Sequence, residues 1–246
     1  SISPDDEVVK SFVITEGNKD LDIVLYSEQG MVKRTKLSDF IVSRTSKTYT
    51  AMKLKDKDKI VSATLSENKN ILITKTGYYL NYSIDEIPVA GTKASGVKGI
   101  NLKDDTLICG LTYKDTDEYL TIFTNKNTAK RIKISELNSL SRAKRGSTLI
   151  KKVKSTNYEI INAFITNKND NILLINDEVT AIKNTDIPIM DEVSTGSNIS
   201  KEKYKNVALS KELVIVSEEV IEMPKKIEDN EIKEMTIDDF INDFKL

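Results

Sequence analysis

Lysine and arginine clusters are the residues of this chain whose types and spacing could do chemistry. Their cationic groups bind phosphate oxygens, and Lys33-Arg34 and Lys130-Arg131 stand at matching places in two similar segments. With the cations of neighbouring strands and loops, they make up a set of candidate binding residues: Lys33, Arg34, Lys36, Arg44, Lys47, Lys93, Lys98, Lys130, Arg131, Lys133, Arg142, Lys144 and Arg145. Two plainer interpretations stay open. Cations on outer strands also guard sheet edges against aggregation, and the last three residues suit a solvated turn.

The sequence lacks the residues and motifs of most common enzyme mechanisms. The chain contains no histidine, which excludes Ser-His-Asp and Cys-His catalysis and imidazole metal sites. It also has no glycine-rich phosphate loop, no paired-cysteine metal motif and no Gly-x-Ser-x-Gly elbow. We therefore expect no catalytic residue, no metal site and no cofactor here. We interpret Asp104-Asp105 as a turn, and Cys109 as a small core residue.

The charge is unevenly distributed along the chain. The net charge of the 246 residues is only −1, but lysine and arginine are concentrated between Leu21 and Lys154 and acidic residues dominate the flanks. Basic charge gathered in one folded region indicates a protein that binds a polyanion. The polar start and the lack of a long apolar run predict a cytoplasmic chain that does not cross a membrane.

The basic segments belong to a repeat that positions them. Versions of one unit begin at Gly30, Gly77 and Asn127, and a worn copy runs from Glu178 to Ile187, roughly 50 residues apart in each case. Alternating apolar and polar residues within each unit predict short strands. We therefore predict an all-β fold of about four propeller-like blades, each a four-stranded antiparallel sheet.

Three regions are expected from this pattern. Residues 1–20 hold one strand, Glu7–Thr15, interpreted as the remnant of an earlier blade, and residues 21–217 form the blades. Residues 218–246 are an acidic tail that ends in a short amphipathic helix over 236–244. Such a tail could compete with a polyanion for the basic surface.

Four stretches together resemble the C-terminal domain of the A subunit of bacterial type IIA topoisomerases: Gly30–Phe40, Ala51–Leu54, Gly91–Asp105 and Ser141–Gly146. The resemblance covers roughly residues 7–217 and implies a β-pinwheel, a disc whose neighbouring blades exchange a strand. It further implies a basic rim that binds and bends double-stranded DNA, holding the transported duplex to steer decatenation and relaxation by the whole enzyme.

The resemblance also implies what lies elsewhere. In that family an Arg-Tyr pair supplies the tyrosine that attacks DNA, and no Arg-Tyr dipeptide occurs here. ATP and magnesium are expected elsewhere in a parent enzyme, in which two A subunits join two B subunits. The sequence also lacks the Gln-Arg-Arg-Gly-Gly-Lys-Gly box of gyrase, which favours the topoisomerase IV branch. The alternatives are a gyrase wrapping domain and a propeller that binds protein.

Overall fold

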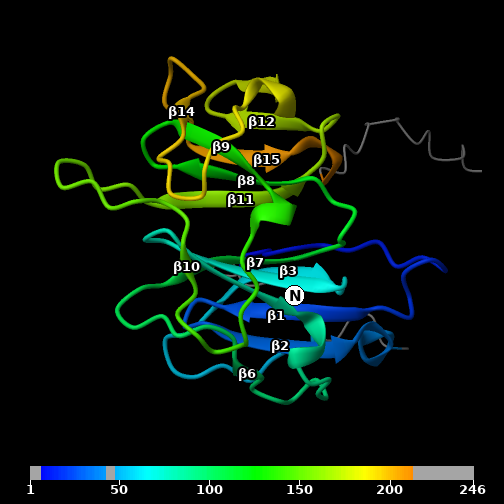
Figure 1. The fold of residues 1–246 in the computed structure, drawn as a ribbon. Helices are drawn as coiled ribbons and strands as arrows, with labels where there is room; N and C mark the ends of the chain where they lie inside the picture. The colour runs from blue at the N-terminus through cyan, green and yellow to red at the C-terminus, as the bar shows by residue number, and fades with distance from the viewer. Residues whose placement is uncertain (1–6, 43–47, 213–246) are drawn as a thin grey trace, which may run out of the picture. The chain divides into compact units, whose positions relative to one another are not determined.

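Four antiparallel sheets follow one another along the chain in the computed structural model, which describes residues 7–42 and 48–212. The first, blade 1, has the strand order β3-β1-β2-β6 (Figure 1). Its strands are β1 (Asp22–Ser27), β2 (Met31–Lys36), β3 (Ile60–Leu65) and β6 (Val97–Lys98). Blade 2 has the order β10-β5-β4-β7, with β4 (Lys69–Thr74), β5 (Tyr78–Ser83), β7 (Leu107–Tyr113) and β10 (Ser147–Thr148).

Blades 3 and 4 repeat the plan. Blade 3 has the order β11-β8-β9-β14, with β8 (Tyr119–Thr124), β9 (Thr128–Lys133), β11 (Ile160–Thr166) and β14 (Ser197–Asn198). Blade 4 has three strands, β13-β12-β15, at Val179–Lys183, Asn171–Ile175 and Asn206–Leu209. A 3-10 helix follows the outer strand of each blade, at Leu37–Phe40, Ile84–Glu86, Ile134–Glu136 and Asn184–Asp186, and a fifth lies at Ser210–Glu212.

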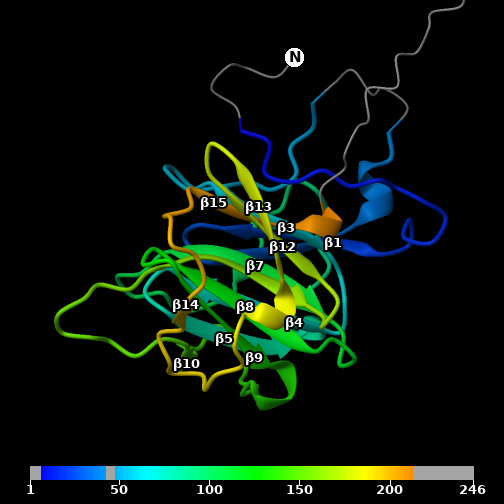
Figure 2. The same cartoon turned by 90° about the horizontal axis from the view of Figure 1, so that it is seen from above.

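The outermost strand of each of the first three blades comes from the next repeat. The strand β6 lies between β5 and β7 in the chain but pairs with β2 (Figure 1). The strand β10 pairs with β5 in the same way (Figure 2). The strand β14 likewise leaves the fourth repeat to pair with β9. We call the stretch from the 3-10 helix of a repeat to its inner strand (β3, β7, β11 or β15) a crossing segment, and its contact with the previous blade a joint. The exchange of strands between blades is thereby confirmed.

The hydrophobic core lies between blades. Blades 1 and 2 pack through a cluster that includes Tyr26, Leu72 and Tyr82, and blades 3 and 4 through one that includes Phe123 and Ile172. The inner strands also bond to one another: Ser62 on β3 exchanges hydrogen bonds with the backbone of Gly110 on β7. Burial of apolar surface between sheets therefore stabilises the array of blades.

The predicted strand at Glu7–Thr15 is wrong. Residues 7–15 form no strand in the structure and are largely exposed, although Phe12 packs against the outer face of blade 1. Alternation of apolar and polar residues is not sufficient for a strand. A strand also needs a neighbouring strand whose backbone groups form hydrogen bonds with its own. The described part of the chain offers no such neighbour to this segment. The acidic tail and its helix lie outside the described residues, and the proposed region boundaries stay predictions.

Gly146 provides a test of how closely the second joint is packed. Its φ is +86°, and a Cβ there would overlap the carbonyl oxygen of Tyr79. We expect Gly146→Ala to lower the free energy of unfolding by about 2 kcal/mol or more, because both the backbone conformation and the contact oppose a side chain. Gly91→Ala is the matched control, since its Cβ would meet nothing within 4 Å. Urea denaturation measures both, and equal stability of the two variants would contradict the expectation.

Candidate nucleic-acid interface

Lys33 and Lys130 are the most deeply buried of the candidate binding residues, with 1% and 0% of their surface exposed. The Lys33 ammonium group donates hydrogen bonds to the carbonyl oxygens of Ala51 and Thr92, both at 2.6 Å. The Lys130 ammonium group donates to the carbonyl oxygens of Leu149 and Asp191, both at 2.8 Å, and to that of Glu192. Neither ammonium group is therefore displayed at the surface, where a binding residue would have to lie.

The reason lies in the exchange of strands. Each lysine occupies an outer strand of its blade, where alternation points it away from the core between blades. The crossing segment of the next repeat then docks over that strand and bends around the ammonium group, because its own carbonyl oxygens have no ladder partner there. Each lysine thus ties two crossing segments together, that of its own repeat and that of the next.

The arginines beside these lysines hold the 3-10 helix of the next repeat. Arg34 forms an ion pair with Asp22 at 2.6 Å and donates to the Ile84 carbonyl oxygen at 3.4 Å. Arg131 donates to the Ile187 carbonyl oxygen at 2.6 Å and lies over the Tyr119 ring, 4.7 Å from its centroid. Arg131 is also buried and is likewise not displayed at the surface.

At the joint between blades 2 and 3, the cations and the carbonyl oxygens exchange sides. The outer strand β5 carries Leu80 and Asn81 in place of a Lys-Arg pair, and the cations come from the crossing segment instead. Arg142 donates to the carbonyl oxygens of Glu86 at 2.9 Å and Lys98 at 2.6 Å. Arg145 donates to the Leu102 carbonyl oxygen and stacks on the Tyr78 ring, 4.0 Å from its centroid.

We call these three sets of contacts carbonyl clasps. They use Lys33 and Arg34 at the first joint, Arg142 and Arg145 at the second, and Lys130 and Arg131 at the third. In every clasp a cation that is wholly or partly buried binds backbone carbonyl oxygens across the joint. None of the six fits the edge-guarding interpretation, which requires exposed cations. The solvated-turn interpretation does not fit Arg142 or Arg145 either.

The other candidates remain at the surface. Lys36, Lys93, Lys98, Lys133 and Lys144 are exposed, and Lys133 pairs with Glu136 at 3.3 Å. Arg44 and Lys47 lie outside the described residues. Four lysines outside the predicted set are exposed on the crossing segments close to these residues in the chain: Lys53, Lys151, Lys152 and Lys154. The run Lys151-Lys152-Val153-Lys154 was a visible signal, but it stands outside the repeated Lys-Arg unit that guided the choice.

Backbone hydrogen bonds connect the crossing segments into one path. The amide of Lys53 donates to the Ala94 carbonyl oxygen at 3.1 Å, that of Asn101 to Lys144 at 2.8 Å, and that of Lys151 to Val193 at 2.9 Å. The path carries a set of lysines that we call the lysine track: Lys53, Lys93, Lys98, Lys144, Lys151 and Lys152. Among the described residues, none of the six forms an ion pair, so the track presents uncompensated positive charge.

A cavity of about 410 Å³ lies at one end of the track. Lys151, Lys152 and Lys154 line it together with Tyr158 and Asn157. The three lysines make this cavity a possible site for an anion. A polyanion that follows the lysine track would reach the cavity beside blade 3.

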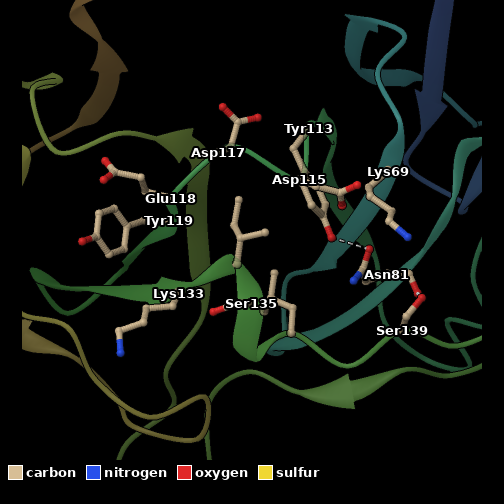
Figure 3. A pocket seen from close by; sticks show the side chains of 12 residues that line it. Lys69, Asn81, Tyr113, Asp115, Asp117, Glu118, Tyr119, Lys133, Ser135 and Ser139 are labelled. Carbon is tan, nitrogen blue, oxygen red and sulfur yellow. Dashed lines mark hydrogen bonds between the residues drawn. The ribbon is translucent and has the colours of Figure 1, made fainter.

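Carboxylates gather at a different place, where one repeat connects to the next. Asp115, Asp117 and Glu118 line a cavity of about 540 Å³ with Lys69 and Lys133, and the Tyr113 hydroxyl donates to Asn81 inside it at 2.8 Å (Figure 3). This cavity therefore mixes carboxylates with cations, in contrast to the lysine track.

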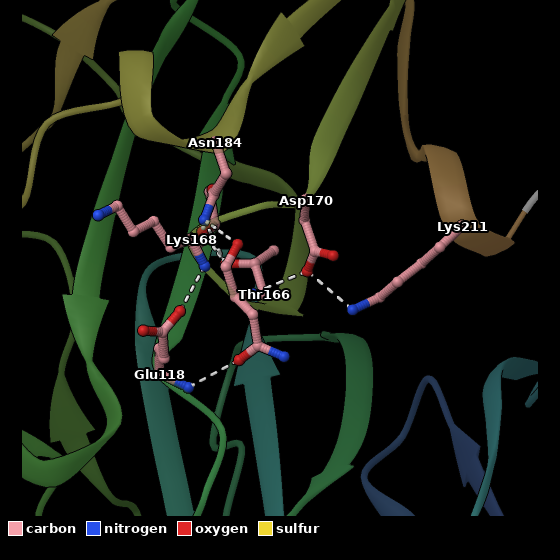
Figure 4. Close-up of polar contacts among 8 residues, drawn as sticks. Glu118, Thr166, Lys168, Asp170, Asn184 and Lys211 are labelled. Atoms are coloured by element: carbon pink, nitrogen blue, oxygen red, sulfur yellow. Dashed lines mark hydrogen bonds and ion pairs between the residues drawn. The ribbon is translucent and has the colours of Figure 1, made fainter.

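Several carboxylates at the connections hold the backbone. Glu118 accepts a hydrogen bond from the amide of Lys168, and Asp170 pairs with Lys211 at 2.7 Å (Figure 4). Asn184 extends this network by donating to Thr166 at 3.1 Å and to the Asn167 carbonyl oxygen at 3.0 Å. These groups are engaged within the fold, and nothing in their contacts favours a ligand.

Other structural findings concern the remaining sequence predictions. Cys109 is buried, which confirms it as a core residue. Over residues 7–42 and 48–212, no group of three or more histidine, cysteine or acidic side chains is placed to hold a metal ion. Over the same ranges, no helix has the length and apolar character needed to cross a membrane.

Lys130 tests whether the clasp stabilises the fold. Lys130→Met keeps the length of the side chain but removes the donor to the carbonyl oxygens of Leu149 and Glu192, and to that of Asp191, which keeps the Ser194 amide as a second donor. We expect it to lower the free energy of unfolding by about 2 kcal/mol, since unsatisfied buried acceptors cost roughly 1–3 kcal/mol. The control Lys133→Met removes an exposed lysine and should change stability by about 0.5 kcal/mol or less. A similar loss in both variants, measured by urea denaturation, would argue against the clasp.

The clasp also predicts a dependence on pH. Burial lowers the pKa of Lys130 to about 7, against the attraction of Glu192 and Asp191, and burial lowers the pKa of Lys33 as well. Above pH 7 the unfolded chain keeps a proton that the folded chain releases from Lys130, so a rise in pH favours the folded state. The stability difference between the natural chain and Lys130→Met should therefore grow from pH 7 to pH 9. A difference that shrinks over this range would oppose the assigned pKa.

Comparisons with known proteins agree with this architecture. A family model described as the DNA gyrase C-terminal domain, beta-propeller, matches residues 22–67, 71–108 and 118–167. The A subunit of DNA topoisomerase 4 from Bacillus subtilis (strain 168) is 32% identical over 166 residues, which are 67% of this chain and 21% of that protein. The corresponding protein of Staphylococcus epidermidis is 29% identical over 170 residues, 68% of this chain and 21% of that protein. The chain therefore spans about a fifth of the length of these relatives.

Solved structures show the same fold. The C-terminal domain of DNA topoisomerase IV superposes with a TM-score of 0.78 at 29% identity, covering 85% of this chain and 67% of that chain. The DNA gyrase A C-terminal domain superposes with a TM-score of 0.68 at 22% identity, covering 78% and 66% of the two chains, and supports the fold alone. Because the family model matches more than half of its residues, the chain belongs to the family of DNA gyrase C-terminal beta-propeller domains.

Proposed function

We propose that this chain binds and bends double-stranded DNA along the lysine track. The observation that carries the proposal is the track itself, in which lysines from three repeats lie on hydrogen-bonded crossing segments without carboxylate partners among the described residues. Phosphate contacts of this kind release counterions and read no base sequence. A duplex that follows such a path is bent, and its phosphate contacts with the lysines offset the bending energy.

The residues proposed to touch DNA are exposed lysines. Lys36, Lys93, Lys98, Lys133 and Lys144 stay in the set, and Lys53, Lys151, Lys152 and Lys154 join it. The clasp residues leave the set, because their cationic groups already bind carbonyl oxygens inside the joints. In this proposal the clasps give the track its shape, and the exposed lysines give it its charge.

The relatives suggest a setting for this activity. We propose that the chain is part of the A subunit of a topoisomerase IV, where it would help to hold the transported duplex during decatenation and relaxation. Such a protein would act in the cytoplasm at the nucleoid, as a dimer joined to two B subunits, with the DNA-cleaving tyrosine, ATP and magnesium elsewhere in the assembly. The absence of a gyrase box from the sequence favours this branch over a gyrase wrapping domain.

Salt-dependent binding tests the proposal. The triple variant Lys93→Gln, Lys144→Gln and Lys151→Gln should weaken binding to any duplex and reduce the slope of log affinity against log salt by roughly 3, because each phosphate contact adds about 0.9 to the slope. Fluorescence anisotropy with two duplexes of unrelated sequence measures both quantities.

The matched control neutralises three exposed lysines away from the track, Lys59, Lys114 and Lys168. It changes the net charge equally and should leave the slope almost unchanged. Equal effects of the two triple variants would show that net charge, and not the track, governs binding. DNA binding that is absent at low salt would instead favour a propeller that binds protein.

A further inference from the structure

Within residues 7–42 and 48–212, the outer edge of blade 4 carries no further strand. Its outer strand β13 pairs there with β12 alone, whereas β2, β5 and β9 each carry a strand from the next repeat. Burial reflects this difference: the four central residues of β5 and of β9 are buried, while Val179, Thr180 and Ala181 on β13 are exposed, Val179 by 62%. An uncovered edge of this kind is a template for another strand.

The three occupied joints follow a rule of charge. Each places its clasp cations on one side only. At the first and third joints the outer strand supplies them, through Lys33 and Lys130, and the crossing segment presents carbonyl oxygens. At the second joint the outer strand supplies none, and Arg142 and Arg145 of the crossing segment bring them. An outer strand without cations at the two clasp positions therefore accepts a segment that carries its own.

Blade 4 has the features of the second type. Counted back from its 3-10 helix, β13 carries Thr180 and Ala181 where β5 carries Leu80 and Asn81. The strand does end in exposed Lys183, but this residue stands at the position of Lys36 and Lys133, which take part in no clasp. The edge also presents acidic groups where blade 2 holds the two arginines. Exposed Glu178 stands at the position of Tyr78, on which Arg145 stacks, and exposed Asp186 stands at that of Glu86, whose carboxylate accepts the amide of Arg142.

We propose that β13 is an acceptor for an extended basic segment with arginines spaced as in the sequence Ser141-Arg142-Ala143-Lys144-Arg145-Gly146. The segment adds antiparallel to β13 as β10 adds to β5. Its first cation reaches the carbonyl oxygens around the 3-10 helix at Asn184–Asp186, and its second reaches Glu178. A segment without cations, like that of the fourth repeat, leaves those acceptors unmatched.

Peptides taken from the chain itself test this inference on the full chain. We expect a peptide of residues 138–150, which carries Arg142 and Arg145, to bind and to shift the amide NMR signals of β13. Its Arg142→Gln, Arg145→Gln version should bind about tenfold more weakly or worse, since two charge-assisted hydrogen bonds are lost. A peptide of residues 188–200, which lacks basic residues at these positions, is the matched weak binder.

Changes on the acceptor side complete the test. The Ala181 amide corresponds to that of Arg131, which donates to the Pro188 carbonyl oxygen in the third joint. Ala181→Pro removes this amide and should abolish peptide binding. Ala181→Val keeps the amide and should bind the peptide normally. Glu178→Lys should weaken binding of the basic peptide. Equal binding of all three peptides, or binding that survives Ala181→Pro, would overturn the proposal. So would self-association of the chain that Ala181→Pro prevents, because a second copy of the same edge would then be the occupant.

Discussion

The contact on which this fold depends is a cation, wholly or partly buried, surrounded by backbone carbonyl oxygens at the joint between two blades. Each partner needs the other. A buried ammonium group such as that of Lys130 loses its hydration and must regain it from acceptors inside the protein. The crossing segment cannot satisfy all its carbonyl oxygens by strand pairing, because β14 is only two residues long and the rest of the segment turns away. A cation at the centre of the turn satisfies both requirements.

This contact separates two kinds of basic residue that look alike in the sequence. Lys33 and Lys93 are both lysines near a strand exchange, yet Lys33 is 1% exposed and Lys93 lies at the surface. Lys33 fixes the position of the crossing segment through its hydrogen bonds. Lys93 is exposed because the crossing segment that carries it lies at the surface. A basic composition can therefore serve folding and polyanion binding at once. The residues with the most regular spacing serve folding, because identical joints need identical contacts, while phosphate contacts tolerate any cation that faces the path.

The sequence was sufficient to predict the repeats, the all-β blades and the burial of Cys109, because these follow from local alternation and turn residues. It failed where a prediction needed to know what covers a strand. The side chain of Lys130 points away from the core between blades, as alternation indicates, but that direction leads into a crossing segment from residues about 60 positions later. Glu7–Thr15 failed for the opposite reason, since it alternates like a strand but no partner covers it. Both errors arise from contacts distant in the sequence, which periodicity does not report.

The placement of cations on alternate sides of successive joints also specifies the order of the blades. A crossing segment with Arg142, docked on an outer strand with Lys130, would bring two cations to one set of carbonyl oxygens. A segment without cations, docked on β5, would leave the oxygens that now accept from Arg142 and Arg145 unsatisfied. Both mismatches are costly in a buried joint. Because the repeats share one plan, a penalty of this kind disfavours docking of a segment on another blade.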